Sequence, residues 1–170
     1  MIKVSFKRLH PEARLPIQAT PGSIGLDLFA HLLTEHGSET KSMIPSLTVK
    51  AIPTGLAIEP PQVSHTIKPG FAGIGEAVPT PQYLVQVVSR SGLALNQNVF
   101  VANAPGIIDP DYRGELKVLL YNGSPQTHWV RHGDRIAQLI LVRAEFAVPT
   151  IVDELSPSLR GDKGLGSSGT

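Results

Sequence analysis

Glycine and proline recur along the whole chain and leave little room for long helices. The 170 residues include 16 glycines and 15 prolines, which lie between short apolar runs. Both residue types interrupt helices and favour turns, so this distribution predicts many short strands joined by turns. The sequence therefore predicts an all-β domain.

The apolar runs indicate where these strands lie. Residues 4–6, 47–49 and 85–87 alternate between apolar and polar side chains, which is typical of strands with one buried face. Residues 115–121 and 136–142 are richer in apolar side chains and are predicted to be buried on both faces.

One segment has a helical pattern, and the rest favours a closed β architecture. Residues 90–98 are expected to form a single short helix that Ser91 caps. We expect a barrel or sandwich in which closure or oligomerisation protects the strand edges.

Length and charge narrow the possible classes of protein. A chain of 170 residues can bury the core of one domain. The net charge of +1 predicts no broad nucleic-acid-binding surface. The absence of cysteine excludes disulfides and thiolate metal sites. No apolar run approaches the roughly 20 residues of a membrane span. We therefore expect a soluble, cytoplasmic protein that binds neither membranes nor nucleic acid.

Two segments depart from the strand pattern. Residues 60–82 contain five prolines and are expected to form an insertion loop or an excursion hairpin. Residues 156–170 are rich in glycine and serine and are expected to be a mobile C-terminal arm. The predicted organisation is a single β-domain over residues 1–155, followed by this arm.

Two early segments combine turn residues with polar side chains. Residues 21–28 place Asp27 in an apolar strand after a Gly/Ser turn, a pattern that by itself favours a structural role. In residues 89–94, Arg90 stands beside small residues at the predicted helix start, where free N–H groups can bind an anion. A capped helix with a surface arginine explains residues 89–94 equally well.

The segment 103–114 is the richest in candidate chemistry. A Pro105–Gly106 turn would join strands 99–102 and 115–121 into a hairpin whose free backbone groups could pair with a planar base. Asp109 and Tyr112 follow that turn. A loop with solvated acids is the alternative interpretation.

Two later segments add polar groups. Gln138 interrupts the apolar run of residues 133–140, so it either finds buried partners or faces a ligand. Residues 160–169 offer backbone N–H groups, hydroxyls and two cations that could wrap an anion. A solvated tail is the alternative for residues 160–169.

In this order, the five segments 21–28, 89–94, 103–114, 133–139 and 160–169 resemble the motifs of the trimeric dUTPase family. The resemblance covers nearly the whole chain. It implies a distorted, jelly-roll-like β-barrel with one short helix, assembled as a homotrimer that exchanges C-terminal arms. It also implies magnesium-dependent hydrolysis of dUTP to dUMP and pyrophosphate. That activity limits uracil incorporation into DNA and supplies dUMP for dTMP synthesis.

The resemblance also assigns roles to single residues. Asp109 matches the general base that activates water, Tyr112 the aromatic ring beneath deoxyribose, and Asp27 the acid that supports Mg²⁺ through water. The substrate-binding residues that it implies are Arg90, Ser91, Gly92, Asn103, Gly106, Ile107, Ile108, Tyr112, Lys117, Gln138, Arg160, Gly164, Leu165, Gly166 and Ser167.

The chain departs from the family pattern in its last motif. Leu165 stands where an aromatic residue usually stacks on uracil, and it lacks a π-face. Two other functions fit part of the pattern: a dCTP deaminase of the same fold, and a dUTPase-like regulatory binding module. The deaminases carry a glutamate in their hairpin region, whereas this hairpin carries Asp109 and Tyr112.

Overall fold

The structure is a computed structural model that describes residues 2–34, 36–61, 82–145, 147, 149–159 and 161–162. Its elements in chain order are β1 (Ser5–Arg8), β2 (Ile17–Gln18), β3 (Leu26–Phe29), β4 (Lys41–Ile44), β5 (Val49–Glu59), β6 (Gln82–Val88), α1 (Ser91–Gln97), β7 (Val99–Val101), β8 (Gly106–Ile108), β9 (Glu115–Asn122), β10 (His128–Arg131) and β11 (Arg135–Ala144).

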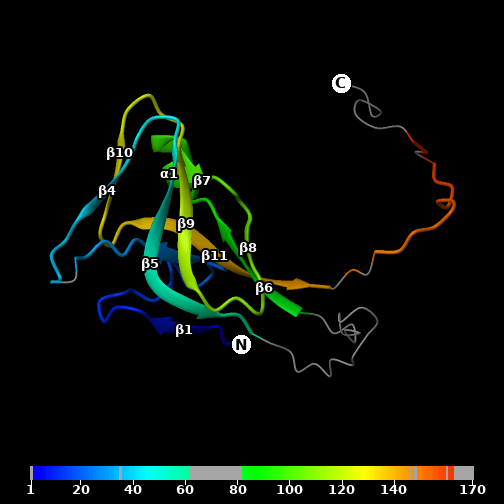
Figure 1. Cartoon of the computed structure of the whole chain (residues 1–170), viewed down its shortest axis with the longest axis horizontal. Coiled ribbons are helices and arrows are strands. Elements are labelled where there is room, and N and C mark those ends of the chain that lie inside the picture. Colours follow the sequence, from blue (N-terminus) through cyan, green and yellow to red (C-terminus); the bar gives the residue numbers. More distant parts are fainter. Residues whose placement is uncertain are drawn as a thin grey trace.

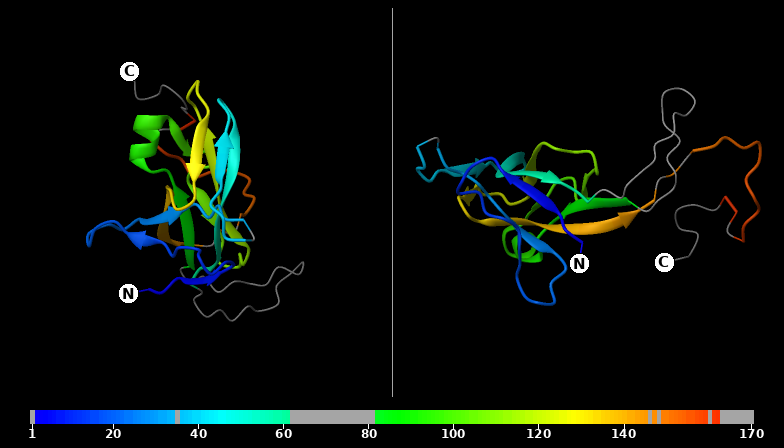
Figure 2. Two further views of the ribbon diagram at one scale, coloured as in Figure 1. Left: turned by 90° about the vertical axis from the view of Figure 1, so that its left-hand side faces the viewer. Right: turned by 90° about the horizontal axis from the view of Figure 1, so that it is seen from below.

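The described strands form antiparallel sheets that pack around one core (Figure 1). A four-stranded sheet has the order β1-β5-β9-β7, and a five-stranded sheet has the order β2-β3-β11-β6-β8. Strands β10 and β4 form a third, two-stranded sheet. Figure 2 shows the same strands from two further directions. The prediction of an all-β, jelly-roll-like domain with one short helix is confirmed.

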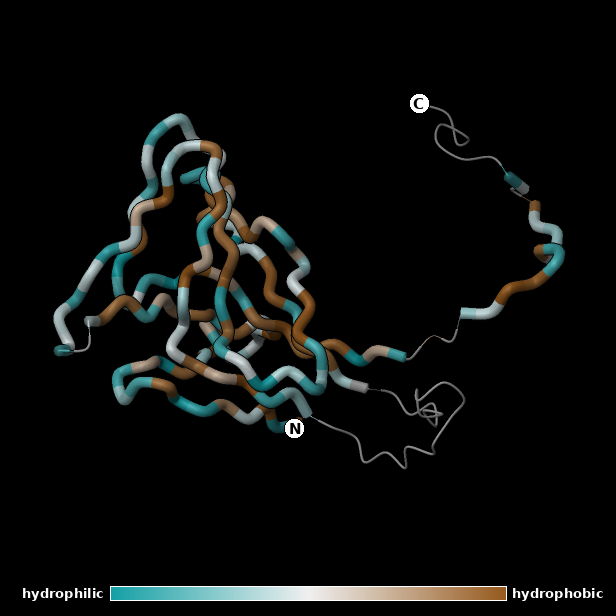
Figure 3. Tube along the Cα trace, viewed as in Figure 1, coloured by the Kyte–Doolittle hydropathy of each residue, from teal (hydrophilic) through white to brown (hydrophobic). Residues whose placement is uncertain are grey.

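The core lies between the two larger sheets, where apolar strand segments face one another (Figure 3). Leu28, Val85 and Leu139 contribute from the five-stranded sheet, and Ile52 and Leu120 contribute from the four-stranded sheet. β9 alternates between buried and partly exposed residues, so its side chains do not lie in the core on both faces as predicted. Side-chain period, more than overall apolarity, fixes which face of β9 is buried.

The long strand β5 lies between β9 and β1. Residues 49–53 pair with β9, residues 56–59 pair with β1, and Ala57 pairs with both after a register irregularity between Pro53 and Ala57. Gly55 lies in this irregularity with φ +69°. A Cβ there would lie 2.8 Å from His31 Cγ, so both the backbone conformation and the space require glycine.

One strand prediction was wrong. Residues 47 and 48 precede β5 and do not belong to it, because Leu47 lies in a turn with φ +57°. The Thr48 hydroxyl donates to the Pro45 carbonyl at 2.9 Å and closes this turn between β4 and β5. An alternating pattern of three residues could not distinguish a strand from a turn.

The two unusual segments lie mostly outside the sheets. Of the predicted insertion, residues 62–81 lie outside the described residues. After β11 ends at Ala144, the described residues up to 162 contain no strand and extend away from the domain (Figure 1). Ile151, Leu155 and Leu159 are exposed there. Among the described helices, none is long and apolar enough to cross a membrane.

Three histidines meet where the chain leaves β3. His31 is only 6 % exposed. Its ring stacks on His10, with 4.6 Å between centroids, and meets the edge of His132 at 5.3 Å. Neither ring nitrogen of His31 has a hydrogen-bond partner among the described residues. Burial lowers the pKa of His31, and the positive forms of His10 and His132 lower it further, against weaker opposite effects of Glu115 and Glu12.

This lowered pKa predicts loss of stability in acid. Folding favours neutral His31, so its contribution is fully present above the ordinary value of 6.5 and is lost as pH falls below it. Burial lowers the pKa of His128 as well, so protonation of His128 in acid also disfavours the folded state. We expect the free energy of unfolding to decrease as the pH is lowered from 6.5, and the contribution of the buried His31 to this slope is at most about 1.4 kcal/mol per pH unit.

Denaturant unfolding between pH 5 and 8, at fixed protein concentration, checks this expectation. His31→Leu should flatten the slope below pH 6.5. His36→Leu changes an exposed histidine and should leave the slope as in the parent protein. Equal slopes in the parent and in His31→Leu would show that His31 does not cause the acid sensitivity.

Candidate functional site

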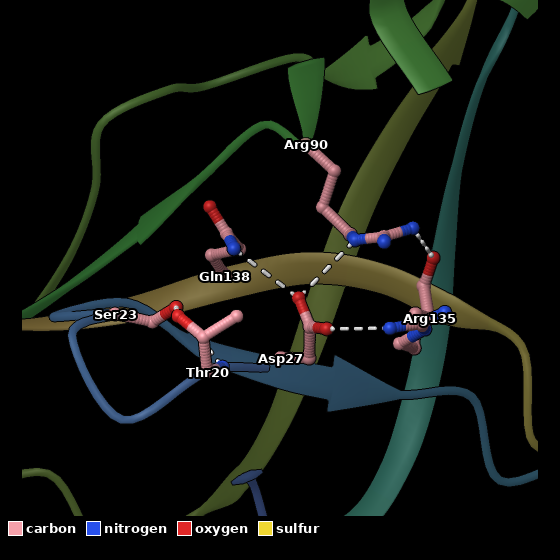
Figure 4. A network of polar contacts seen from close by, with 6 residues as sticks. All are labelled: Thr20, Ser23, Asp27, Arg90, Arg135 and Gln138. Carbon is pink, nitrogen blue, oxygen red and sulfur yellow. Dashed lines mark hydrogen bonds and ion pairs between the residues drawn. The ribbon is translucent and has the colours of Figure 1, made fainter. Parts of the chain in front are cut away.

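A buried carboxylate lies at the centre of a polar cluster on the five-stranded sheet (Figure 4). The Asp27 side chain is 2 % exposed. Its Oδ1 accepts hydrogen bonds from Arg90 Nε and Gln138 Nε2, each at 3.2 Å. Its Oδ2 accepts one from Arg135 Nη1, also at 3.2 Å. Arg90 Nη1 donates to the Arg135 carbonyl at 3.0 Å. Two cations therefore fix one buried anion and leave an excess of positive charge.

Strand register brings this cluster together. β3, β11 and β6 are consecutive in the sheet order. Asp27 on β3 is directly opposite Gln138 on β11, and Gln138 is opposite Val88 on β6. Arg90 follows Val88 by two positions. Two candidate site residues, Asp27 and Gln138, thus lie directly opposite each other, and Arg90 reaches Asp27 from just beyond the end of β6.

Arg135 is a member of the cluster that the sequence did not predict. It begins β11, beside a register irregularity between Arg135 and Ala137 where β11 pairs with β3. The sequence showed an arginine at the start of a core strand, but the partner of that arginine depends on this irregularity. The hydroxyls of Thr20 and Ser23, in the turn before β3, lie 2.8 Å apart beside the cluster (Figure 4).

A hollow of about 360 Å³ adjoins the cluster. Its lining includes the basic side chains of Arg90, Arg131 and Arg135, together with apolar side chains such as Leu93 and Ile136. Guanidinium groups bind planar or tetrahedral anions through several parallel N–H donors. The surroundings of Arg90 therefore suit an anionic ligand better than a neutral one.

The helix that follows Arg90 differs from the prediction in its cap. α1 begins at Ser91, and the residue at the cap position is Arg90, with no side-chain hydrogen bond to the helix. Ser91 is therefore the first helical residue and not the cap. Ser91 and Gly92 are exposed. The neighbouring Ser89 hydroxyl accepts a hydrogen bond from Val101 N at 2.9 Å, which ties this segment to β7.

The predicted hairpin is present, but its connection contains an extra strand. β7 pairs with β9 as expected. The turn lies at residues 102–103, and Gly106 already begins β8, which pairs with β6. The predicted Pro105–Gly106 turn is therefore wrong. β8 is the last strand in its sheet among the described strands, so its outer edge can pair with a base. The Asn103 side chain lies against Gly106, where a Cβ would be 3.1 Å from Asn103 Nδ2.

The remaining candidates of this segment lie beyond β8. Asp109 is exposed, and Tyr112 is 40 % exposed. Lys117 on β9 is half-exposed, with its Nζ 3.5 Å from Glu115 Oε2. Because Gly106 is opposite Val87 and Ile108 is opposite Val85, β8 leads Asp109 away from the Arg90 end of β6. Within one chain, the acid and the basic cluster are therefore separate.

Five candidates belong to the arm. Arg160, Gly164, Leu165, Gly166 and Ser167 lie outside the described residues.

The described residues do not fit a metal site built by the protein alone. They contain no group of three or more His, Cys, Asp or Glu side chains that could hold a metal ion. Both carboxylate oxygens of Asp27 are occupied by nitrogen donors. Magnesium prefers oxygen ligands and keeps several waters. A magnesium ion at this site would need most of its oxygens from water and from its ligand.

Comparison with known proteins gives one consistent family. The family model described as dUTPase matches residues 71–169. A deoxyuridine 5'-triphosphate nucleotidohydrolase of Helicobacter hepaticus is 41 % identical over 166 residues, which cover 98 % of this chain and 88 % of the relative. The protein of the same name from Shewanella baltica is 37 % identical over 169 residues, which cover 99 % and 95 % of the two chains.

Solved structures share the fold. A mutant of the dUTPase of Staphylococcus bacteriophage 80alpha, determined with dUpNHpp, matches with a TM-score of 0.76 at 21 % identity over 100 % of both chains. A dUTPase mutant from phage phi11 of S. aureus, described with a structural Mg(II) ion, matches with a TM-score of 0.69 at 18 % identity over 92 % of this chain and 100 % of that one.

Proposed function

The chain belongs to the dUTPase family, and we infer from this membership that it hydrolyses dUTP to dUMP and pyrophosphate. The structural observation that supports this function best is the cluster in which Asp27 holds Arg90 and Gln138, with Arg90 also lining a hollow of basic character. The names of these relatives do not favour the deaminase or the non-catalytic binding module.

Asp109 is the general base in this proposal. Its carboxylate is exposed and accepts a proton from the attacking water, whose oxygen bonds to the α-phosphorus. The bond between that phosphorus and the oxygen that bridges to the β-phosphate breaks, and pyrophosphate leaves with both bonding electrons. Phosphoryl transfer needs this positioning and charge stabilisation more than covalent catalysis.

Arg90 and Gln138 hold the phosphates, together with the exposed N–H groups of Ser91 and Gly92. The Arg90 guanidinium is held through Nε by Asp27 and through Nη1 by the Arg135 carbonyl. Its orientation is thus fixed before the ligand arrives, which lowers the entropic cost of binding. Asp27 contributes by orienting these donors.

Recognition of the nucleoside falls to the segment after β7. The outer edge of β8 from Gly106 to Ile108, with the Asn103 side chain, recognises uracil. The Tyr112 ring lies beneath the deoxyribose and leaves no space for a 2′-hydroxyl. Lys117 adds a cation near the substrate. Arg160 and residues 164–167 close over the triphosphate.

In this proposal a magnesium ion would be held mainly by the triphosphate and by water. Members of this family generally depend on a divalent metal ion. Bound to the substrate, the ion neutralises phosphate charge. Asp27 reaches it at most through water, since nitrogen donors occupy both of its oxygens.

A homotrimer with shared sites explains the separation of the two halves of the site. β8 carries Asp109 away from the Arg90 cluster within one chain, so a second copy has to supply the other half. The exposed apolar residues Ile151, Leu155 and Leu159 suit an arm that packs on a neighbouring subunit. Sedimentation equilibrium should give three times the mass of one chain.

Hydrolysis in H₂¹⁸O tests the site of attack. Attack on the α-phosphorus places the label in dUMP, and attack on the β-phosphorus places it in pyrophosphate. We expect label in dUMP alone. Label in pyrophosphate would contradict the assignment of Asp109 to water at the α-phosphate, and release of ammonia from dCTP would indicate the deaminase.

A further inference from the structure

The turn that carries Tyr112 is closed by hydrogen bonds on both sides of this residue. Tyr112 N donates to the Asp109 carbonyl at 3.1 Å. The Tyr112 hydroxyl donates to the Glu115 carbonyl at 2.8 Å. Arg113 Nη1 donates to the carbonyls of Pro110 and Tyr112, each at 2.8 Å. The aromatic ring is therefore fixed at both its backbone and its hydroxyl end.

Gly114 provides the space in which the ring lies. A Cβ on this residue would be 2.5 Å from Tyr112 Oη and 2.7 Å from Tyr112 Cζ. Non-bonded carbon atoms are best separated by about 3.5–4.0 Å. A methyl group on residue 114 and the present position of the Tyr112 ring are therefore incompatible. The three atoms nearest to that position all belong to the Tyr112 side chain, so the ring has to move if a methyl is added.

Glu115 anchors the carbonyl that holds the Tyr112 hydroxyl. Its Oε1 accepts a hydrogen bond from Gly55 N at 3.1 Å, in the irregular part of β5. Its Oε2 lies 3.5 Å from Lys117 Nζ. The Glu115 side chain is 24 % exposed, so the bond to Gly55 is partly shielded from water. Glu115 thus links the Tyr112 ring to β5, because its side chain bonds Gly55 and its carbonyl bonds the Tyr112 hydroxyl.

We propose that Gly114 and Glu115 are positioning residues for sugar selection. Gly114 leaves space for the Tyr112 ring, and Glu115 fixes the Tyr112 hydroxyl relative to β5. Neither residue needs to touch the substrate. The inference rests on the proposed role of Tyr112 beneath the deoxyribose. Its consequence is that substitutions at these two positions change the preference for dUTP over UTP, whereas a purely structural role would lower both activities equally.

The test compares kcat/KM for dUTP and for UTP in the full chain. Gly114→Ala should lower the ratio of dUTP to UTP by about tenfold or more, because displacement of about 1 Å is enough for effects of this size. Glu115→Ala should lower the ratio in the same direction. Glu115→Gln keeps an oxygen for Gly55 N while it removes the charge near Lys117, so it should restore a ratio close to that of the parent.

Two variants of Tyr112 keep the test decisive. Tyr112→Ala removes the ring and should reduce the ratio most, and an unchanged ratio in this variant would overturn the proposed role of Tyr112 itself. Tyr112→Phe keeps the ring and Gly114 but loses the hydrogen bond to Glu115, so an intermediate loss is expected even if Gly114→Ala does not fold. A reduced ratio in Tyr112→Ala, with parental ratios in Tyr112→Phe, Glu115→Ala and Gly114→Ala, would overturn the positioning role alone.

Discussion

Asp109→Asn lowers kcat for dUTP by about 10²- to 10⁴-fold and leaves dUTP affinity near that of the parent protein. The reason is that an amide keeps the size and the hydrogen-bonding oxygen of the side chain but cannot accept the proton of the attacking water. Asp109 is exposed and is not part of the core, so the substitution should not change stability. Steady-state turnover and isothermal titration with dUTP measure the two effects separately.

Asp111→Asn is the matched control for this variant. Asp111 is an exposed acid in the same turn, two positions from Asp109, and the exchange has the same chemistry and the same change in charge. It should retain most of the parental kcat. If the two variants lose turnover equally, the negative charge of the turn matters and Asp109 is not the base.

The second large effect is expected at Asp27. Asp27→Asn removes the charge that holds Arg90 and Arg135 and places an amide N–H₂ group against one of the donors. Hydrogen bonds to charged groups contribute about 1.5–3 kcal/mol each, and the two arginines regain part of this by turning toward water. We expect a loss of about 2–3 kcal/mol in the free energy of unfolding and a loss of about 100-fold in kcat/KM.

Asp134→Asn provides the comparison at a nearby acid. Asp134 is exposed and its Oδ2 accepts one hydrogen bond, from Arg131 N at 2.8 Å. This variant should lose no more than about 1 kcal/mol and little activity. Equal losses in the two variants would contradict the central position of Asp27. A higher magnesium requirement in Asp27→Asn, with unchanged pyrophosphate affinity, would favour metal support over orientation of Arg90.

The fold class was predictable because it depends on local properties. Turn residues at short intervals exclude long helices. The sequence predicts that the apolar runs around Val85 and Leu139 form strands with buried side chains, and both residues are buried in the structure. The failures were also local. Leu47 satisfies an alternating pattern but lies in a turn, and Ser91 has the side chain of a cap but lies one position inside the helix.

The site was predictable as a set of residues but not as an arrangement. Motif order identified Asp27, Arg90 and Gln138, and strand register then placed Gln138 opposite Asp27, with Arg90 just beyond the end of β6. Register depends on long-range pairing, which the spacing of residues along the chain does not reveal. For the same reason the sequence did not indicate Arg135 as a partner of Asp27. The contact between Gly114 and Tyr112 is local, but it depends on the conformation of the turn, which the residue types alone do not specify.

Pyrophosphate release from dUTP, with dCTP, dTTP and UTP in parallel and in either Mg²⁺ or EDTA, tests the central claim most directly. The proposed site predicts release from dUTP alone and loss of this activity in EDTA, because β8, Tyr112 and the metal-bound triphosphate act together. Release from UTP at a comparable rate would contradict the sugar selection by Tyr112. No release from any of the four nucleotides would contradict the assignment of this chain as a dUTP-hydrolysing enzyme.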